Sequence, residues 1–470
     1  MKYEAVIGLE IHAELETATK AFCSCLNAFG DERNTNVCPV CLGLPGALPV
    51  LNRKAVELAI SAGMMLGCSI SRSTRWDRKN YFYPDLTKAY QISQLYAPLC
   101  LGGGLEINSR FIRLNRIHLE EDAGKLIHEK GVTIMDYNRA GVPLIEIVTE
   151  PDLRSPDDAV EFVEKVRQTL VYGGICDGKM EQGSLRVDAN ISVMPEGSKI
   201  YGTRSEIKNI NSFRFIKKAL AHEIERQMDL VSEGGRVVQE TRRYDENSGE
   251  TFSMRTKEDA HDYRYFPDPD IPSLLILEEE IGRIRAGLTE APASRFSRYT
   301  SALGLSPRDA SAILSRRRTA DFFDAAVSAG ANPKNAANSI KGEIQRLLNE
   351  SGDETQPISM PIQDFVKALA LAQENKITQE GLKIALSAMY SEKIGIGEVA
   401  KKYSLYVSED NAAIKEAVES VIASDPASVA KYKNGNEKVL SFLLGQCMKK
   451  LRGKALPQTI GEELKKALER

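Results

Sequence analysis

Apolar and polar side chains alternate along residues 6–15, VIGLEIHAEL, so the chain is predicted to open with a β-strand. One face of this strand is apolar, and the other carries Glu10, His12 and Glu14. Carboxylate and imidazole groups are ligands for divalent cations such as Mg²⁺ or Mn²⁺. A solvated face is the ordinary interpretation of the same alternation. A metal site therefore requires that other strands bring acidic and basic side chains to the same place.

Two later segments repeat the alternation and add acidic side chains. Residues 110–124 end their alternation in three consecutive acids, a run that is also common in solvated turns. Residues 142–152 form a strand with two acids on one face, and the first of these lies among aliphatic residues, where an acid usually has a partner or a role. The acids of the two segments are Glu120, Glu121, Asp122, Glu146 and Glu150.

Strands predicted over residues 184–193 and 204–208 supply further polar side chains on one face. These residues are Arg186, Asp188, Asn190, Arg204, Glu206 and Lys208. In one twisted sheet, all these strands would form a concave, acid-lined surface with basic residues at its rim, which suits a nucleoside triphosphate held through metal ions. The P-loop pattern is absent, because Leu119 stands where the glycine upstream of Gly124 and Lys125 would be.

Helical spacing of apolar residues predicts helices over about residues 53–66, 157–172 and 215–233. Beyond residue 281 the chain changes to short helices rich in Ala, Leu, Lys and Glu, with prolines as breaks, and no acid-bearing strand recurs. The predicted fold class is α+β, with a mainly antiparallel sheet domain followed by two all-helical domains. The expected boundaries are 1–288 for the sheet domain, 289–402 for a helical linker domain and 403–470 for a helical tail domain.

The composition is that of a soluble globular protein, with 470 residues, 42% hydrophobic and 27% charged. A secretory signal pattern and an apolar run of membrane-spanning length are both absent, so we expect a cytoplasmic protein without a membrane partner. The net charge is −3, so any nucleic acid must be held by a local basic patch. We interpret the basic cluster of the tail as an RNA contact, with a solvated helix face as the alternative. Its residues are Lys431, Lys433, Lys449, Lys450, Arg452 and Lys454.

Four of the eight cysteines form two close pairs, a Cys-x-Cys and a Cys-x-x-Cys separated by twelve residues. This spacing favours one structural, tetrahedral zinc site in a loop over residues 23–41, with four unrelated thiols as the alternative. The four cysteines are Cys23, Cys25, Cys38 and Cys41.

Residues 76–91 mix aromatic side chains with Arg, Lys and Asp, which is unusual for a surface loop. Such a segment lines a polar passage or stacks on a nucleotide base, and an aromatic corner that closes a core fits the pattern equally well.

Several long motifs together resemble one family. They are VIGLEIH at residues 6–12, DRKNYFYPD at 77–85, EEDAGK at 120–125, GSLR at 183–186 and DYRYFP at 262–267. The chain closely resembles, along its whole length, the B subunits of tRNA-dependent aspartyl/glutamyl amidotransferases. The resemblance implies a glutamine-synthetase-like cradle for the sheet domain and a carbon–nitrogen ligase with glutamine as amido donor. Such an enzyme corrects mischarged Glu-tRNA(Gln), and often Asp-tRNA(Asn).

In that family the B subunit phosphorylates the side-chain carboxylate with ATP, and ammonia then displaces the phosphate. The resemblance implies a heterotrimer, in which an amidase (the A subunit) makes the ammonia and a small C subunit ties the pair together. This chain lacks a Gly-Ser-rich amidase stretch and a Cys/His nucleophile pair, which agrees with that division of labour.

Position by position, the resemblance implies four functional sets. The Mg²⁺ (or Mn²⁺) ligands and catalytic residues would be Glu10, His12, Glu121 in preference to Glu120, and Glu150. The nucleotide-binding residues would be Arg186, Asp188, Asn190, Glu206 and Lys208. The ammonia channel would begin at Lys79, Tyr81, Tyr83 and Lys88. The basic cluster of the tail would bind the body of the tRNA.

Two other functions fit parts of the same sequence. One is a stand-alone ligase that acts on a free amino acid, as glutamine synthetase does, for which a basic tail domain has no use. The other is a non-enzymatic, zinc-bearing RNA-binding protein, which would not turn over ATP. Dependence of ATP hydrolysis on tRNA separates the three.

Overall fold

The computed structural model describes residues 2–256, 263–352, 357–407, 411–433, 436, 438–451 and 455–469. The chain divides into two compact units, Met1–Pro292 and Ala293–Arg470. The first unit contains strands and helices, with the strands β2 to β11 following one another without a helix between them, and the second is helical. The predicted α+β class, an antiparallel sheet domain followed by helices, is therefore confirmed.

A ten-stranded sheet forms the centre of the first unit, with β1 between β12 and β11. Its order is β15-β14-β13-β12-β1-β11-β8-β6-β2, and β7 also pairs with β8. Among the described strand pairs of this sheet, only β13 and β14 run parallel. The strands are β1 (Tyr3–Glu14), β2 (Ser69–Ile70), β6 (Cys100–Leu101), β7 (Gly104–Ile107), β8 (Arg110–Glu121), β11 (Pro143–Thr149), β12 (Leu185–Pro195), β13 (Ser205–Ile210), β14 (Glu240–Tyr244) and β15 (Thr251–Thr256).

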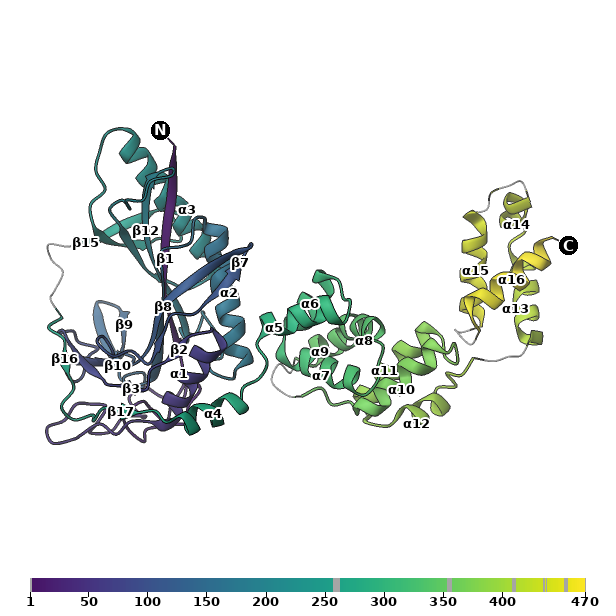
Figure 1. Cartoon of the computed structure of the whole chain (residues 1–470). Coiled ribbons are helices and arrows are strands. Elements are labelled where there is room, and N and C mark those ends of the chain that lie inside the picture. Colours follow the sequence, from purple (N-terminus) through teal and green to yellow (C-terminus); the bar gives the residue numbers. More distant parts are fainter. Residues whose placement is uncertain are drawn as a thin grey trace. The chain divides into compact units, whose positions relative to one another are not determined.

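One face of the sheet is covered by helices. Figure 1 shows α1 (Arg53–Met65), α2 (Pro156–Tyr172) and α3 (Phe213–Ser232) on the same side of β8, β1 and β12. The apolar side chains of β1 pack there in the main core, together with those of the helices. α2 begins at Pro156 because the Ser155 hydroxyl accepts a hydrogen bond from the Asp158 N–H, 3.1 Å away.

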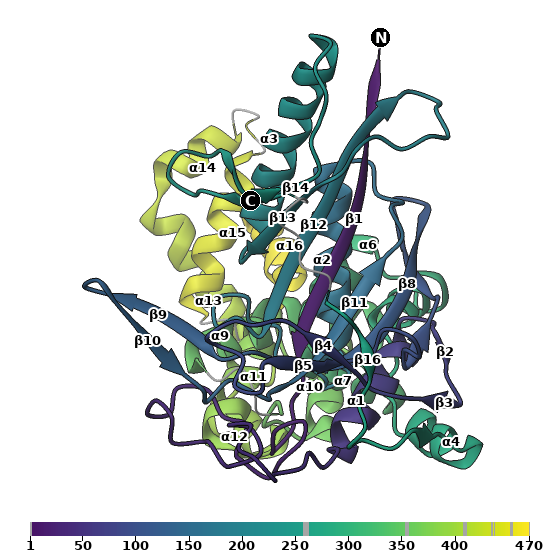
Figure 2. The same ribbon diagram turned by 90° about the vertical axis from the view of Figure 1, so that its left-hand side faces the viewer.

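The opposite face of the sheet carries the polar side chains. Figure 2 shows β12, β1, β11 and β8 side by side from this face, with β4 and β5 crossing in front of one end. The smaller sheets are β9 (Lys125–Glu129) with β10 (Val132–Asp136), β16 (Phe266–Pro267) with β4 (Asp77–Asn80) and β5 (Tyr90–Ser93), and β17 (Leu274–Leu275) with β3 (Ser73–Thr74). The helix α4 (Glu278–Ala286) follows them.

Short helices build the second unit, and several begin at a proline. Pro307, Pro333 and Pro457 are each the first residue of a helix, where the missing N–H has no intrahelical partner to lose. The helices are α5 (Pro292–Ser297), η2 (Arg298–Ala302), α6 (Pro307–Leu314), α7 (Arg317–Ser328), α8 (Pro333–Ser339), η3 (Ile340–Ile344), α9 (Gln345–Ser351), α10 (Ile362–Gln373), α11 (Gln379–Glu392), α12 (Ile396–Lys402), α13 (Asn411–Ser424), α14 (Pro426–Lys433), α15 (Lys438–Lys450) and α16 (Pro457–Leu468).

The last four helices share a hydrophobic core of their own. Val418 of α13, Leu443 and Cys447 of α15, and Ile460 and Leu464 of α16 are all fully buried in it. This core agrees with a helical tail, and the boundary between residues 402 and 403 stays a prediction.

Candidate active site

His12 lies in the middle of the polar face of the sheet. It stands opposite Glu146 of β11 on one side and Arg186 of β12 on the other. Glu146 in turn stands opposite His118 of β8. Because directly opposed residues of an antiparallel sheet project to the same face, these four side chains form one row across four strands.

A first group of side chains able to bind a metal consists of His12, Glu120 and Glu146, whose ligand atoms all lie within 4.8 Å of one another. His12 Nε2 is 3.3 Å from Glu146 Oε2 and 3.9 Å from Glu120 Oε1. His118 Nε2 lies 3.6 Å from Glu146 and 3.7 Å from Glu120. Two imidazoles and two carboxylates from three strands thus converge on one point.

The charges of this group depend on one another. Burial alone would raise the pKa of Glu146, but His118 and His12 beside it hold that pKa well below its usual range. Burial also opposes protonation of His12, whereas its hydrogen bond to Glu146 raises the pKa of the imidazole. The anionic Glu146 can bind a divalent cation directly, and His12 can do so once its imidazole has lost the proton.

A second group consists of Glu10, Asp188 and Glu206, again with ligand atoms within 4.8 Å of one another. Burial, followed by the charges of Glu146 and Glu206, raises the pKa of Glu10. Lys208 Nζ lies 3.3 Å from Asp188 Oδ2 and 2.9 Å from Glu206 Oε1. Three crowded carboxylates with one ammonium keep an excess of negative charge, and a hard divalent cation with oxygen ligands fits such a set.

A cavity of about 600 Å³ lies beside the second group. Glu10 and Asn190 belong to its wall, and Asn190 Nδ2 donates a hydrogen bond of 3.0 Å to Glu10 Oε1. The wall combines aliphatic, aromatic and polar residues, namely Val6, Gly8, Leu9, Val148, Thr149, Pro151, Ser192, Tyr201, Gly202, Thr203, Arg204 and Gln239. A mixed wall of this kind suits a ligand with an apolar ring and a polar end.

A buried cluster of ion pairs closes the other end of the face. The Asp122 carboxylate accepts hydrogen bonds from Arg139 Nε at 2.7 Å and Arg186 Nη2 at 2.8 Å. Arg139 Nε also lies 3.1 Å from Glu14 Oε1. Burial and the nearby Asp122 charge raise the pKa of Glu14 to about 7, against the two arginines. Arg186 is thus held by an acid within the protein.

Aromatic side chains lead from the segment around β4 toward the first group. Lys79 Nζ lies 4.8 Å from the ring centre of Tyr263 and 5.6 Å from that of Tyr81. Tyr263 packs edge-on against both Tyr81 and Tyr265, with ring centres 5.6 and 6.1 Å apart. The positive charge of Lys79 also lowers the pKa of the Glu146 carboxyl, by less than the two histidines do.

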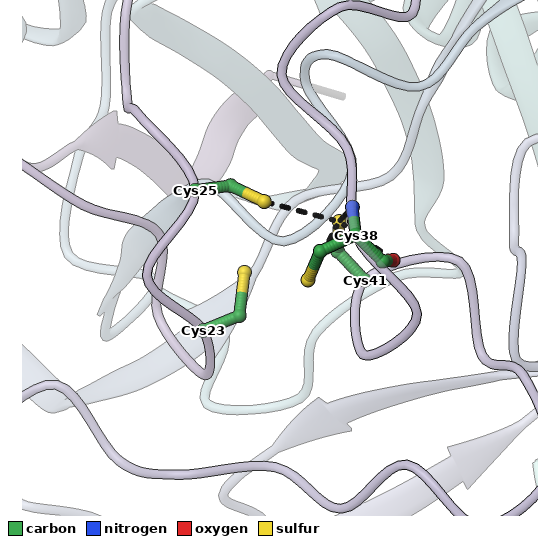
Figure 3. A group of neighbouring side chains, drawn as sticks. All are labelled: Cys23, Cys25, Cys38 and Cys41. Atoms are coloured by element: carbon green, nitrogen blue, oxygen red, sulfur yellow. Dashed lines mark hydrogen bonds between the residues drawn. The ribbon is translucent and has the colours of Figure 1, made fainter.

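The four cysteines of the first loop converge. Figure 3 shows their sulfur atoms turned toward a common centre, and all four lie within 4.8 Å of one another. The hydrogen bond from Cys23 lowers the pKa of Cys41 to about 4, and the ammonium of Lys20 contributes, against burial. Lys20 is fully buried, with its Nζ 3.8 Å from Cys41 Sγ. Four thiol ligands beside a buried cation fit a structural zinc ion.

Comparison with known proteins decides the family. The family model described as "GatB/GatE catalytic domain" matches residues 5–282, and the one described as "GatB domain" matches residues 321–468. The B subunit of aspartyl/glutamyl-tRNA(Asn/Gln) amidotransferase from Syntrophotalea carbinolica is 47% identical over 474 residues, covering 99% of each chain. The proteins of the same name from Thermoanaerobacter pseudethanolicus and Geobacter sulfurreducens are 48% and 47% identical, each covering 100% of both chains.

The chain belongs to the GatB family. The predicted resemblance and the predicted enzyme class, a component of a carbon–nitrogen ligase, are therefore confirmed. The relatives are named as B subunits, so the family works in a multi-subunit enzyme. Within the described residues, none of the helices is both long and apolar enough to cross a membrane.

For this GatB chain, the structure places two of the four predicted ligands in the metal-binding groups, His12 in the first and Glu10 in the second. Glu121 instead pairs with Lys88, 2.5 Å away, and also accepts a hydrogen bond from the Ile92 N–H. Glu150 accepts a hydrogen bond of 2.8 Å from Asn115 Nδ2. The geometry supports Glu120 and Glu146 as the partners of His12, and a ligand role for Glu121 or Glu150 stays a prediction.

The remaining predicted residues of the GatB chain fall as follows. Asp188, Asn190, Glu206 and Lys208 surround Glu10, whereas Arg186 binds Asp122. Lys79 and Tyr81 lie in the aromatic cluster, and the Tyr83 side chain is exposed. In the tail, Lys431 and Lys433 of α14 and Lys449 and Lys450 of α15 are exposed. Arg452 and Lys454 lie outside the described residues.

The sequence did not identify His118 or Arg139 as residues of the site, and it favoured Glu121 over Glu120 as a metal ligand. The signal for His118 and Glu120 was present, because both alternate with the buried Ile117 and Leu119. Nothing local marked Arg139, which reaches Asp122 from the turn before β11.

Proposed function

We propose that the first unit catalyses ATP-dependent transamidation of Glu-tRNA(Gln), Asp-tRNA(Asn) or both. In this proposal the side-chain carboxylate of the esterified amino acid attacks the γ-phosphate of ATP, and ADP leaves. Ammonia then attacks the acyl phosphate, and inorganic phosphate leaves as the amide forms. The observation that carries the proposal is the placement of two metal-binding groups and a cavity of about 600 Å³ on one face of the sheet.

The chemistry explains why the carboxylate must be activated. Ammonia cannot displace oxide from a carboxylate, whereas phosphate is a good leaving group from an acyl phosphate. Phosphoryl transfer between two anions requires positioning and charge neutralisation more than covalent help from the protein. An acid-lined face with ammonium and guanidinium groups at its edges can supply both the positioning and the charge neutralisation.

The nucleotide is proposed to occupy the cavity beside Glu10. Val6, Val148 and Tyr201 offer apolar and aromatic contacts for a base, and Arg204 offers a positive charge. Glu10, Asp188 and Glu206 would hold one Mg²⁺ (or Mn²⁺), and His12, Glu120 and Glu146 would hold another. Bound there, such ions neutralise charge on the phosphates. Lys208 and Asn190 keep Asp188, Glu206 and Glu10 oriented toward that site.

The ammonia is proposed to come from a partner amidase, the A subunit, with a small C subunit completing the heterotrimer. Lys79, Tyr81, Tyr83 and Lys88 would line its entry, because Lys79 and Tyr81 lead toward Glu146 and Lys88 closes on Glu121. Zinc at the four cysteines would fix the loop beside this entry, since the Thr87 hydroxyl donates a hydrogen bond of 2.6 Å to the Cys41 carbonyl.

The helical tail is proposed to hold the body of the tRNA through its exposed lysines. The proposed location is the cytoplasm, where tRNA is charged.

The test of the proposed function is ATP hydrolysis by the purified heterotrimer with each mischarged tRNA in turn, and with free glutamate and aspartate. We expect turnover only with mischarged tRNA. Turnover with a free amino acid would indicate a stand-alone ligase, and none with any substrate would indicate an RNA-binding protein without catalysis.

A further inference from the structure

We infer that Arg116 binds the reacting carboxylate of the aminoacyl-tRNA, an anion-binding residue aimed at the active face by a β-bulge; the inference rests on the proposed function.

The bulge lies in β8, beside the first metal-binding group. Val148 of β11 pairs with Arg116, but the next residue, Thr149, pairs with Leu114, so Asn115 is the extra residue. Leu114 and Ile117 are both buried in the core although they are three positions apart. Regular alternation places only every second residue on a face, so the bulge turns both Asn115 and Arg116 away from the core. Bulges often re-aim a side chain next to an active site.

Arg116 shares its row of the sheet with Glu10. Glu10 stands opposite Val148, and Val148 stands opposite Arg116. The charges that act on Tyr265 show that the Arg116 guanidinium also lies near the first group. Burial raises the pKa of the Tyr265 phenol. The charges of Glu120 and Glu146 raise this pKa further, and the positive charge of Arg116 lowers it. Arg116 therefore lies within electrostatic reach of the same phenol as two carboxylates of the first group.

The charge of Arg116 is not matched by an acid. Across the described part of the chain it forms no ion pair; its Nη1 donates a hydrogen bond of 3.1 Å to Asn115 Oδ1, while its Nε is buried without a partner. Arg139, Arg186 and Lys208, which are cations of the same face, each contact a carboxylate within 3.3 Å. Asn115 in turn donates to Glu150, a contact that fixes the amide against which Arg116 is oriented.

The substrate carboxylate is the anion that this position fits. The face is acidic, so a second anion is repelled unless a free cation meets it, and a guanidinium matches a carboxylate with two hydrogen bonds. The described wall of the nucleotide cavity includes Val148 but not Arg116. In-line phosphoryl transfer needs donor and acceptor on opposite sides of the phosphorus, so the acceptor belongs on the β8 side, where Arg116 lies.

The test compares Arg116→Gln with Arg113→Gln in the assembled heterotrimer. Arg113 is a matched control, because it lies three residues away on the same strand and is exposed in an ion pair with Asp152. We expect Arg116→Gln to lower kcat/KM for mischarged tRNA by at least about 30-fold, the loss of a hydrogen-bonded contact between two charged groups, with an unchanged Kd for ATP. Arg113→Gln should stay within about twofold of the unaltered enzyme.

Two further measurements keep the outcome clear. Methylguanidinium added to Arg116→Ala should restore part of the activity, which a purely structural defect would not allow, and Arg116→Lys should fall between the unaltered enzyme and Arg116→Gln. Unchanged kcat/KM in Arg116→Gln, or a loss confined to ATP binding, would overturn the inference. If the unaltered heterotrimer shows no tRNA-dependent ATP hydrolysis, the proposed function itself fails, and the two failures are thus distinguishable.

Discussion

His12 of β1 and Glu146 of β11 face each other across paired strands, with His12 Nε2 3.3 Å from Glu146 Oε2. Glu120 completes this group from β8, whereas its neighbour Glu121 turns to Lys88. Two adjacent carboxylates of one strand thus have different surroundings, and their substitution separates two functions.

Glu120→Gln and Glu121→Gln should therefore behave differently. We expect Glu120→Gln to lower tRNA-dependent ATP hydrolysis by at least about 100-fold, because it removes a proposed metal ligand. Glu121→Gln should keep most ATP hydrolysis but form less amide per ATP, because it disturbs the Lys88 pair at the proposed ammonia entry. Both rates are measured in one assay of phosphate and amide. Equal losses of ATP hydrolysis in the two variants would contradict the assignment.

Loss of zinc should affect the structure only near the cysteine loop. Chelation of zinc, or Cys25→Ser, should increase hydrogen exchange in the cysteine loop and in β9–β10, which the loop contacts through Asn34 Nδ2 and the Met135 carbonyl, 3.0 Å apart. Exchange in the core of α13–α16 should not change. Elemental analysis of chelator-free protein should give about one zinc per chain.

Cys68→Ser is the matched control for Cys25→Ser, since Cys68 is partly buried and lies outside the group of four. Protein purified without stoichiometric zinc would count against the site.

A pH-dependent contribution to stability is expected from Glu223 of α3. This side chain is fully buried, with Oε1 2.6 Å from Arg226 Nη2 and Oε2 3.2 Å from Arg242 Nε. Burial alone would raise the pKa of Glu223, but the hydrogen bonds from Arg226 and Gln227 lower it. A depressed pKa stabilises the fold above the unfolded-state pKa of about 4.3 and loses that contribution as pH falls toward the folded value.

Glu223→Gln should therefore lower the free energy of unfolding of the first unit by about 3 kcal/mol at pH 7, with a smaller difference below about pH 4. Denaturant titration at several pH values measures this, and Glu225→Gln, an exposed site on the same helix, is the control. A difference that stays constant from pH 7 to pH 3 would show that the ion pairs are not its source.

The tail lysines should set the salt dependence of tRNA binding. Changing Lys431, Lys433, Lys449 and Lys450 to Gln should weaken binding and reduce the slope of log K against log salt by about one unit for each lost phosphate contact. Lys465 and Lys466 are exposed on α16, a helix that packs on the same core as α14 and α15, and they serve as the control pair. Unchanged affinity and slope would leave the four lysines as a solvated face.

Local pattern predicted the elements that position the site. The helices expected over about 157–172 and 215–233 are found at Pro156–Tyr172 and Phe213–Ser232, because apolar spacing and serine caps mark their starts. The polar face of β1 was equally readable, since Leu9 and Ile11 are buried on the other side. Alternation alone therefore gives which side chains share a face.

Alternation could not give which strands are neighbours. That Glu146, rather than Glu150, meets His12 follows from the pairing of β11 with β1, which joins residues 130 or more positions apart. The bulge at Asn115 added a second difficulty, because it shifts the alternation of β8 by one residue between Leu114 and Ile117. Counted from Ile117 and Leu119, the same alternation selects Glu120.

The central claim is that the side-chain carboxylate is phosphorylated on this face. The most direct measurement uses mischarged tRNA whose glutamate or aspartate side-chain carboxylate carries ¹⁸O, with the heterotrimer, ATP and glutamine, and analyses the released phosphate by mass spectrometry. Since the acyl phosphate breaks at its carbon–oxygen bond when ammonia attacks, one labelled oxygen should appear in phosphate for each amide formed. Amide formation with unlabelled phosphate would contradict the account.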